Sequence, residues 1–350
     1  MGKRTIKRTT IKYKKEETYN KLIPTGCTLL DLAIGGGLPL GRVVNIVGDR
    51  SAGKTILTTE VVVSAKCSKD LDIHHVYDDA EHGYSIPTEK MYGMTIRKED
   101  DYSSDTIQDL QFNLKKEQDE LEEGKTLLYI LDSVEGMDAD EDIDYREKAL
   151  KARAEGKEVK GSYGMGKARH MNELLRSKQA KNKDTLLVFV SQTRDKINAT
   201  FGNTKTRHCE KALEFNCDII LYLRIAKAIE KTVDKKKYTI GSITEVMVKK
   251  NKVIGSKFKP LIIVRDGLGI DDVDTNLCFL YDLISLKEGI KEKVSIDFDG
   301  KQFKTRTSLI NYIEDNNAED KIKVLVKEKW EGIIDKLSVK NRRRRFKLEE

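Results

Sequence analysis

The sequence is poor in the residues that cross-link a chain or interrupt its helices and strands. It holds four prolines and five cysteines among 350 residues, and no two cysteines form a CxxC pair. An odd, dispersed set of cysteines in a chain of this length is typical of reduced thiols in a cytosol, so we expect a cytoplasmic protein. The spacing of cysteine and histidine gives no support to a metal site built from those residues.

Long apolar runs are also missing. No stretch of 18 apolar residues occurs, so we expect no membrane span. The basic N-terminus has no apolar core behind it, and we therefore expect no secretory signal. Hydrophobic residues make up 38% of the chain and charged residues 35%, which favours a soluble globular protein with a highly charged surface.

Positive charge is concentrated at the two ends. Residues 1–21 carry a net charge of +6 and residues 336–350 a net charge of +5, while the whole chain carries +7, so the body between them is mildly acidic. We expect a basic N-terminal arm over 1–21 and a basic, disordered tail over 336–350. Basic arms suit a polyanionic partner such as nucleic acid. From charge alone, solvated disordered ends are an equally good interpretation.

Between the ends, short β-branched apolar runs alternate with segments of helical character. Such runs are typical of strands buried on both faces of a mostly parallel sheet, and the alternation predicts an α/β fold. The predicted strands are Val43–Val47, Ile73–Tyr77, Thr126–Leu131, Leu186–Val190 and Asp218–Leu223. The predicted helices are Lys54–Lys66, Asp105–Glu123 and Met165–Lys181.

The rest of the chain divides into an insertion, two further strands and a small lobe. The highly charged Asp138–Lys160 predicts a helical or mobile surface insertion. Thr244–Lys252 and Lys259–Arg265 predict two later strands that can pair antiparallel. C-terminal to them, helices surround a predicted hairpin with an Asp-Gly turn. We therefore place a core domain over 22–269 and a small α+β C-terminal lobe over 270–335.

The clearest motif is a phosphate-binding loop. Residues 48–55 read GDRSAGKT and match G-x4-G-K-[ST] after an apolar strand and before a helix, the context that the motif requires. The glycines let backbone N–H groups turn toward phosphate oxygens, and the helix N-terminus adds its positive end. Lys54 would reach the β- and γ-phosphates. The residues expected to hold the nucleotide are Gly48, Asp49, Arg50, Ser51, Ala52, Gly53, Lys54, Thr55, Asp132 and Ser133.

Two acidic residues at strand ends complete the expected site. Asp132 ends the apolar strand Thr126–Leu131, where it can hold Mg²⁺ through water, so Thr55 and Asp132 are the predicted metal ligands. Glu81 lies just beyond the strand Ile73–Tyr77, beside the expected γ-phosphate, and is the candidate base or orienter for an attacking water. Taken alone, Glu81 can equally be an isolated surface acid.

On both sides of the phosphate loop, the chain resembles the RecA recombinase family. Segment 22–42 is similar to the opening of that family's core, and the run DAEH at 79–82 resembles its catalytic-glutamate segment. The strand LLVFVSQ, which ends at Gln192, resembles the one whose glutamine senses the γ-phosphate. The resemblance covers residues 22–334, including the small lobe, and implies a RecA-like P-loop ATPase core that uses ATP and Mg²⁺.

The run KNK at 250–252 matches two lysines that contact the ATP of a neighbouring subunit in that family. Lys250 and Lys252 have the period-two spacing of one strand face, so both would point the same way. Aimed at a neighbour's γ-phosphate, they would stabilise transferred charge, and ATP would hold subunits together in a helical filament. An exposed basic strand face is the alternative. The catalytic residues implied by the resemblance are Glu81, Gln192, Lys250 and Lys252.

Two segments resemble the family's DNA-binding loops. The run FGN at 201–203 matches the second loop, where Phe201 would stack on bases and cations would meet phosphates. The segment that ends at Met165 resembles the first loop, and a basic helix face follows it. The residues implied for DNA binding are Met165, Arg169, Arg176, Arg194, Lys196, Phe201, Gly202, Asn203, Lys205 and Arg207. A basic surface loop with a core phenylalanine and an ordinary exposed helix face are the alternatives.

Some positions depart from the family pattern. Cys209 and Glu210 stand where the second loop usually has two glycines, and a carboxylate so close to DNA phosphates is unfavourable. Thr88 occupies the place of the aromatic residue that stacks on adenine, with Tyr84 and Tyr92 nearby as substitutes. The basic C-terminal tail stands where the family often has an acidic one, which would weaken autoinhibition of DNA binding.

The resemblance implies a DNA-dependent ATPase that forms a filament on single-stranded DNA and promotes homologous pairing and strand exchange. Its expected partners are single-stranded and double-stranded DNA, further copies of the chain, and single-strand-binding or loader proteins. Two alternatives stay open: a RecA-fold ring helicase or motor, and an ATP-binding DNA-coating protein without significant turnover. The FGN and KNK runs argue against the first, and Glu81 and Gln192 argue against the second.

Overall fold

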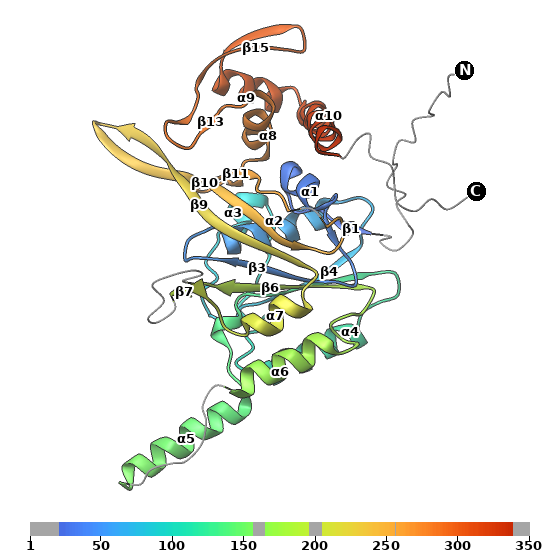
Figure 1. The fold of residues 1–350 in the computed structure, drawn as a ribbon, viewed down its shortest axis with the longest axis vertical. Helices are drawn as coiled ribbons and strands as arrows, with labels where there is room; N and C mark the ends of the chain where they lie inside the picture. The colour runs from blue at the N-terminus through green and yellow to red at the C-terminus, as the bar shows by residue number, and fades with distance from the viewer. Residues whose placement is uncertain (1–20, 157–164, 196–204, 256, 339–350) are drawn as a thin grey trace, which may run out of the picture.

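The computed structural model describes residues 21–156, 165–195, 205–255 and 257–338, and its centre is a twisted sheet between helices (Figure 1). The sheet has eight strands in the order β12-β11-β10-β9-β3-β6-β5-β4. Strands from β4 to β9 in this order run parallel to their neighbours, and those from β9 to β12 run antiparallel. The predicted α/β fold with a mostly parallel central sheet is confirmed. The strands are β3 Val43–Gly48, β4 Ile73–Asp78, β5 Thr126–Leu131, β6 Thr185–Gln192, β9 Ile219–Val233, β10 Lys236–Asn251, β11 Leu261–Arg265 and β12 Gly269–Ile270.

Shorter strands form separate two-stranded sheets around this one. They are β1 Leu22–Ile23 with β2 Leu38–Pro39, β7 Arg194–Asp195 with β8 Lys205–Thr206, β13 Ile284–Ser285 with β14 Gly289–Ile290, and β15 Lys293–Phe298 with β16 Lys301–Thr305. The pair β7–β8 begins directly after β6, so it extends from the edge of the main sheet where β6 ends.

Helices cover both faces of the main sheet (Figure 1). They are α1 Thr28–Ile34, α2 Lys54–Cys67, α3 Thr88–Tyr92, α4 Ile107–Asp119, α5 Asp140–Ala154, α6 Met165–Arg176, α7 Glu210–Asn216, α8 Asp272–Tyr281, α9 Arg306–Asp315 and α10 Glu319–Leu337. The helices α2, α4 and α6 correspond to the predicted ones. The helix α4 begins after Thr106, which forms a capping box with Asp109, so the predicted start at Asp105 was two residues early.

The parallel strands divide their side chains between two hydrophobic cores, one on each face of the sheet. In β5, Ile130 belongs to one core and its neighbours Tyr129 and Leu131 belong to the other. All residues of β5 are buried, because strand side chains alternate with a period of two and helices cover both faces. Leu57 of α2 closes the first core, and Leu110 of α4 closes the second.

The strands β9 and β10 form a long hairpin whose outer half leaves the sheet beside the C-terminal lobe (Figure 1). It turns at Asp234 and Lys235, whose φ values of 50° and 64° suit a two-residue type I′ turn. The Nζ of Lys227 ties the hairpin to the lobe by donating to the carbonyl oxygen of Lys287 at 2.6 Å. The sequence predicted only the inner ends of these strands, because the outer residues are exposed and show no buried face.

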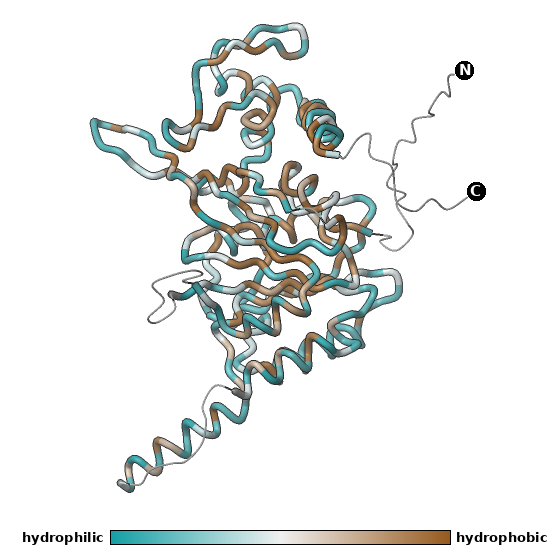
Figure 2. Tube along the Cα trace, in the orientation of Figure 1, coloured by the Kyte–Doolittle hydropathy of each residue, from teal (hydrophilic) through white to brown (hydrophobic). Residues whose placement is uncertain are grey.

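The charged insertion projects from the body as the helix α5 (Figure 1), and its residues are mostly hydrophilic (Figure 2). Its first turn is acidic and its last turn is basic, which matches the helix dipole. The helical alternative for Asp138–Lys160 is therefore confirmed over Asp140–Ala154. Residues 157–160 of the predicted insertion lie outside the described residues.

The C-terminal lobe has a small hydrophobic core of its own. Its buried members are Leu277, Ile296, Phe298, Leu309, Ile313, Ala318, Ile322 and Val326. The predicted hairpin is β15–β16, and its turn lies at Asp299 and Gly300, with φ values of 55° and 73°. The helix α10 runs to Leu337 and so includes the first two residues of the predicted tail. The rest of that tail from 339 on, and residues 1–20 of the predicted N-terminal arm, lie outside the described residues.

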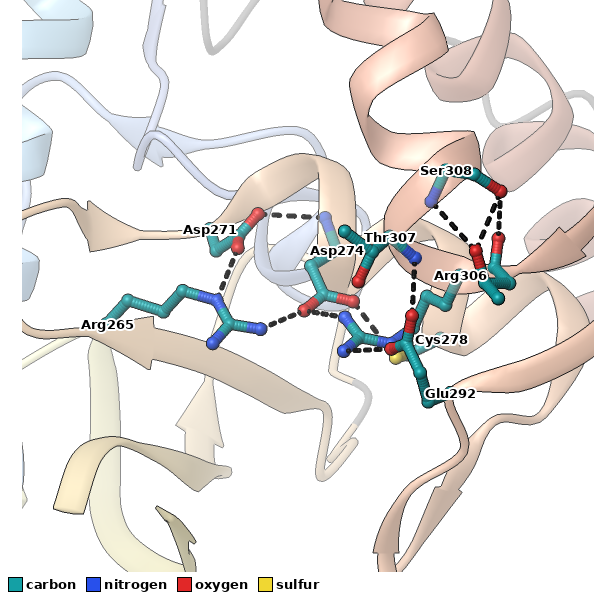
Figure 3. A network of polar contacts seen from close by, with 9 residues as sticks. Arg265, Asp271, Asp274, Cys278, Glu292, Arg306, Thr307 and Ser308 are labelled. Atoms are coloured by element: carbon teal, nitrogen blue, oxygen red, sulfur yellow. Dashed lines mark hydrogen bonds and ion pairs between the residues drawn. The ribbon is translucent and has the colours of Figure 1, made fainter. Parts of the chain in front are cut away.

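A buried ion network joins this lobe to the edge of the sheet (Figure 3). Asp274 of α8 is fully buried and accepts hydrogen bonds from Arg265 of β11, at 2.5 Å, and from Arg306 of α9. Arg265 also pairs with Asp271 at 2.7 Å, and Arg306 pairs with Glu292 at 3.0 Å. Each guanidinium faces two carboxylates, so the buried charges are compensated and the lobe is held to β11.

Within the described ranges, no helix combines the length and the apolar character needed to cross a bilayer. The same ranges contain no group of three or more histidine, cysteine, aspartate or glutamate side chains arranged to hold a metal ion. All five cysteines are free thiols, and Cys27, Cys217 and Cys278 are buried.

Candidate nucleotide-binding site

The parallel strands bring the predicted site residues together at one edge of the sheet. Gly48 at the end of β3 pairs with Gln192 at the end of β6, and Leu131 at the end of β5 pairs with Asp78 at the end of β4. Since β5 also pairs with β6, the segments that follow all four strands begin side by side. These segments are the phosphate loop, the start of β7, the Asp-Ser pair after β5 and the turn that carries Glu81.

The phosphate loop between β3 and α2 has the backbone that a phosphate cradle needs. Ser51 and Gly53 have φ values of 59° and 89°, in the left-handed region, and Gly53 caps the N-terminus of α2. A side chain at Gly48 would meet the carbonyl oxygen of Leu223 at 2.7 Å, so this position requires glycine. The loop and the helix N-terminus behind it fit a phosphate group.

Lys54 lies inside this loop with 7% of its surface exposed. Its Nζ donates to the carbonyl oxygen of Asp49 at 2.8 Å. Burial lowers the pKa of Lys54, and the negative charges of Asp132, Glu81 and Glu135 act in the opposite direction. The ammonium group is therefore held by the backbone of its own loop among three carboxylates, where an incoming phosphate oxygen can take over the bond.

The two predicted metal ligands are in direct contact. The hydroxyl of Thr55 donates to Oδ2 of Asp132 at 2.8 Å, and the hydroxyl of Tyr77 donates to the same oxygen at 2.9 Å. Burial raises the pKa of Asp132, and the hydrogen bonds from Thr55 and Tyr77 lower it. A hydroxyl beside a buried carboxylate is an oxygen donor set that suits Mg²⁺. No motif marks Tyr77 in the sequence, because it is one residue of an otherwise ordinary strand.

Glu81 and Gln192 are hydrogen-bonded to each other across the site. Nε2 of Gln192 donates to both carboxylate oxygens of Glu81, at 2.6 and 2.9 Å, and the hydroxyl of Ser133 donates to Oε1 of Glu81. Asp79 shapes the turn that carries Glu81, because its carboxylate accepts the backbone N–H of Tyr84 at 2.9 Å. The structure thus brings together the two residues that the sequence placed after different strands.

A further acid, Glu135, was not identified from the sequence. Its Oε2 accepts the backbone N–H of Gln192 at 2.8 Å, and its Oε1 accepts that of His208 at 3.4 Å. Burial raises the pKa of Glu135. One carboxylate therefore links the end of β6 to the residues before α7. Glu135 lies in a short 3-10 helix, Val134–Gly136, and no motif marks it.

Lys250 and Lys252 lie at the opposite edge of the sheet from the phosphate loop. Asn251 pairs with Ile219, which in turn pairs with Val44 near the start of β3. Nζ of Lys250 donates to the carbonyl oxygen of Glu214 at 2.6 Å. Nζ of Lys252 lies 3.1 Å from the carboxylate of Asp218. Both ammonium groups contact segment 214–218 of their own chain, so neither lies at the phosphate loop of that chain.

The two arginines on α6 that are predicted to contact DNA face outward. Arg169 and Arg176 are both exposed. Arg169 donates to Oε1 of Glu141 on α5 at 2.7 Å, and His170 lies 2.9 Å from the same oxygen. Met165 is the first residue of α6. The remaining predicted contacts Lys196, Phe201, Gly202 and Asn203 lie outside the described residues.

The predicted contacts Arg194 and Lys205 lie on the paired strands β7 and β8. Arg194 is exposed and pairs in register with Thr206. Lys205 does not extend freely into solvent, because its Nζ lies 2.5 Å from the carboxylate of Asp49 in the phosphate loop. The stem formed by β7 and β8 therefore lies against the phosphate loop.

Arg207 was predicted to contact DNA, but it is buried, with 4% of its surface exposed. Its guanidinium lies over the ring of Tyr222, 5.4 Å from the centroid, and 3.5 Å from the carboxylate of Glu214. It also lies 3.8 Å from Glu210, so the carboxylate that departs from the family pattern faces a cation. Its positive charge is paired inside the protein. We therefore infer that Arg207 packs against Tyr222 and neutralises the carboxylates of Glu210 and Glu214.

The two tyrosines near the expected adenine position both contact α2. The hydroxyl of Tyr84 is hydrogen-bonded to that of Thr59 at 3.0 Å, and the hydroxyl of Tyr92 donates to Glu60 at 2.8 Å. Thr88 is 5% exposed. Both tyrosines therefore lie beside the helix that begins at the phosphate loop.

The chain matches a known protein family. Residues 1–264 match the family model described as the RecA N-terminal domain. The chain belongs to the RecA family. It is 34% identical to Protein RecA of Methylococcus capsulatus over 236 residues, which are 66% of this chain and 61% of that protein. It is also 34% identical to Protein RecA of Thioalkalivibrio sulfidiphilus over 234 residues, or 66% of this chain and 62% of that protein.

The match to the RecA family confirms the predicted RecA-like core. The chain spans about three fifths of the length of these two relatives. The matched range contains the phosphate loop, Glu81, Gln192 and the two lysines of the KNK run, and it ends within β11. The C-terminal lobe begins after the end of this match.

Proposed function

We propose that this RecA-family chain is a DNA-dependent ATPase that forms a filament on single-stranded DNA and promotes homologous pairing and strand exchange. The observation that carries the proposal is the hydrogen bond between Gln192 and Glu81. Glu81 lies at the candidate site of hydrolysis, and Gln192 lies one residue before Thr193, which leads into the β7–β8 stem of the proposed DNA-binding segment. A side chain in this place can respond to a γ-phosphate and move a segment that contacts DNA.

The proposed nucleotide contacts come from the loop 48–55 and the acid after β5. Backbone N–H groups of the loop would bind phosphate oxygens, and Lys54 would exchange the carbonyl oxygen of Asp49 for the β- and γ-phosphates. Thr55 and Asp132 would hold Mg²⁺, which would offset the charge of the phosphates and hold them in line for transfer. Arg50, Ser51, Ala52 and Ser133 complete the proposed contact set.

Glu81 is the proposed base or orienter of the attacking water. In the structure its carboxylate accepts hydrogen bonds from Gln192 and Ser133. A γ-phosphate that attracts the amide of Gln192 would release Glu81 to accept a proton or hydrogen bond from water. The same exchange would make the position of β7 depend on whether nucleotide is bound, because Gln192 and Thr193 are neighbours in the chain and β7 follows them.

Lys250 and Lys252 are proposed to act on the ATP of an adjacent subunit. Asn251, between them, lies level with Val44, which is four residues before Gly48 at the start of the phosphate loop. At the rise of a β-strand, four residues span roughly 13 Å. Lysines at one edge and a phosphate loop at the other suit a head-to-tail contact, in which each interface completes one site. Repetition of that contact gives a filament, and ATP at the interface would stabilise it.

The DNA contacts remain those implied by the family motifs, without Arg207. Arg169, Arg176 and Arg194 are exposed cations that can meet phosphates of single-stranded or double-stranded DNA. Phe201 would stack on bases, with Lys196, Gly202 and Asn203 beside it. Single-strand-binding and loader proteins are further proposed partners. The five dispersed, unpaired cysteines suit the cytoplasm as the compartment.

The decisive experiment measures ATP hydrolysis without DNA, with single-stranded DNA and with duplex DNA, using Lys54→Ala as the blank. Strong stimulation by single strands, absent in the blank, is the expected result. Turnover that does not respond to DNA would overturn the proposal. Electron microscopy of the same mixtures separates a filament from a ring, and a ring would favour a helicase or motor.

A further inference from the structure

The carboxylate of Asp49 holds the phosphate loop against the stem formed by β7 and β8. Both carboxylate oxygens accept a bond from Nζ of Lys205, at 2.5 Å each. Oδ1 also accepts the hydroxyl of Thr193, and the backbone N–H of Thr193 donates to the carbonyl oxygen of Gly48 at 3.2 Å. The side-chain bonds from Lys205 and Thr193 lower the pKa of Asp49, and the bond from Lys205 is the largest cause.

Asp49 contacts the chain on both sides of the FGN run at 201–203. Thr193 precedes β7 and Lys205 begins β8, and these two strands pair with Arg194 opposite Thr206. A single side chain therefore holds both strands of the stem. Motion of Asp49 has to move or release both of them.

The same residue also contacts the phosphate-binding lysine. The carbonyl oxygen of Asp49 accepts Nζ of Lys54, while its carboxylate accepts Nζ of Lys205. A bound phosphate would draw Lys54 from that carbonyl oxygen and would place negative charge beside the Asp49 carboxylate. The phosphate would compete with the Asp49 carboxylate for Nζ of Lys205, and this competition would weaken the hold of Asp49 on the stem.

We propose that Asp49 and Lys205 are a positioning pair that keeps the stem docked on the phosphate loop until nucleotide binds and then frees Lys205 for DNA phosphates. Together with Gln192, the pair would make the affinity for DNA depend on whether nucleotide is bound. This inference rests on the proposed function, because it assigns a control to the same ATP and DNA sites. Its side chains are half-exposed, 50% for Asp49 and 45% for Lys205, so the pair can open without disrupting the core.

The test measures the affinity of the full chain for a labelled oligothymidylate, by fluorescence anisotropy, without nucleotide and with a slowly hydrolysed ATP analogue. Asp49→Asn is expected to raise the nucleotide-free affinity by about fivefold or more, the lower range of a coupling between two sites, and to reduce the effect of the analogue by the same factor. Asp49→Glu keeps the charge that bonds Lys205, so DNA affinity in this variant is expected to remain dependent on the analogue. Asp70→Asn makes the same charge change on an exposed residue before β4, at the opposite edge of the sheet, and serves as the matched control.

Hydrogen exchange of the stem amides, without nucleotide, tests the same inference independently of DNA. Asp49→Asn and Lys205→Gln are each expected to speed exchange in β7 and β8, and the double variant is expected to exchange no faster than either one. Equal exchange in Asp49→Asn and wild type would overturn the inference. If the wild type binds no DNA in either nucleotide state, the proposed function fails, and the exchange rates alone then decide whether Asp49 holds the stem.

Discussion

Nε2 of Gln192 lies 2.6 Å from Oε1 of Glu81, although the two residues are 111 positions apart in the chain. The contact exists because Gln192 ends β6, Glu81 follows β4, and β5 lies between these strands in the sheet. It places a neutral amide against the carboxylate that is proposed to orient water. The proposed hydrolysis would need the amide to leave the carboxylate first.

Glu81→Gln is expected to keep the binding of ATP and DNA and to lose hydrolysis. The substitution preserves the size and hydrogen-bonding capacity of the side chain but removes its basicity, so turnover should fall by about 10²–10⁴-fold. Turnover and nucleotide binding are measured on the same preparation. Hydrolysis at the wild-type rate in this variant would show that Glu81 is not the catalytic acid-base group.

Lys250→Ala and Glu81→Gln are expected to complement each other when mixed. If Lys250 acts on the neighbour's nucleotide, a Lys250→Ala subunit still offers an intact Glu81, and a Glu81→Gln subunit still offers an intact Lys250. With random assembly about a quarter of the head-to-tail interfaces would be complete, so hydrolysis should return in the mixture. Turnover that stays at the sum of the two separate variants would contradict action between subunits.

Asp274→Asn is expected to destabilise the junction between the core and the C-terminal lobe. The substitution replaces the carboxylate that accepts from both Arg265 and Arg306, although each guanidinium keeps one other carboxylate (Figure 3). Because a hydrogen bond to a charged group contributes about 1.5–3 kcal/mol, we expect a loss of this order. Urea unfolding measures the free energy. Asp299→Asn, which breaks an exposed pair with Lys321 in the same lobe, is the control and should change stability little.

The free energy of unfolding is expected to fall as the pH rises from about 4 to about 7, because of the titration of Asp31. Burial raises the pKa of Asp31 from 3.8 to about 7, and the hydrogen bonds from Thr25 lower it. In that window the unfolded chain has released the proton and the folded chain retains it, so folding is favoured at the acidic end. Asp31→Asn cannot titrate, and it should gain stability relative to the wild type, by a few kcal/mol, as the pH rises from 4 to 7.

Chemical unfolding at several pH values measures this difference. Comparison with Asp31→Asn removes the contribution of the other acids, since they are common to both proteins. A stability difference that does not vary with pH would mean that Asp31 has the same pKa in the folded and unfolded chain.

The sequence alone determined the features that depend on neighbouring residues. Alternating apolar runs predicted the parallel strands, since strands buried on both faces need apolar side chains at every position. The phosphate loop could be predicted because its glycines, Lys54 and Thr55 act through their own backbone and the following helix. The turn at Asp299 and Gly300 was predicted for the same reason, because a two-residue turn selects its residues locally.

Only the tertiary structure decided the contacts between distant segments. Tyr77 and Glu135 carry no motif, and they enter the site because strand order places them beside Asp132 and Gln192. Arg207 lies in a basic segment that suggested DNA binding, yet packing against Tyr222 and Glu214 buries its charge. Burial of a charged group depends on what surrounds it in space, and a linear pattern does not contain that information.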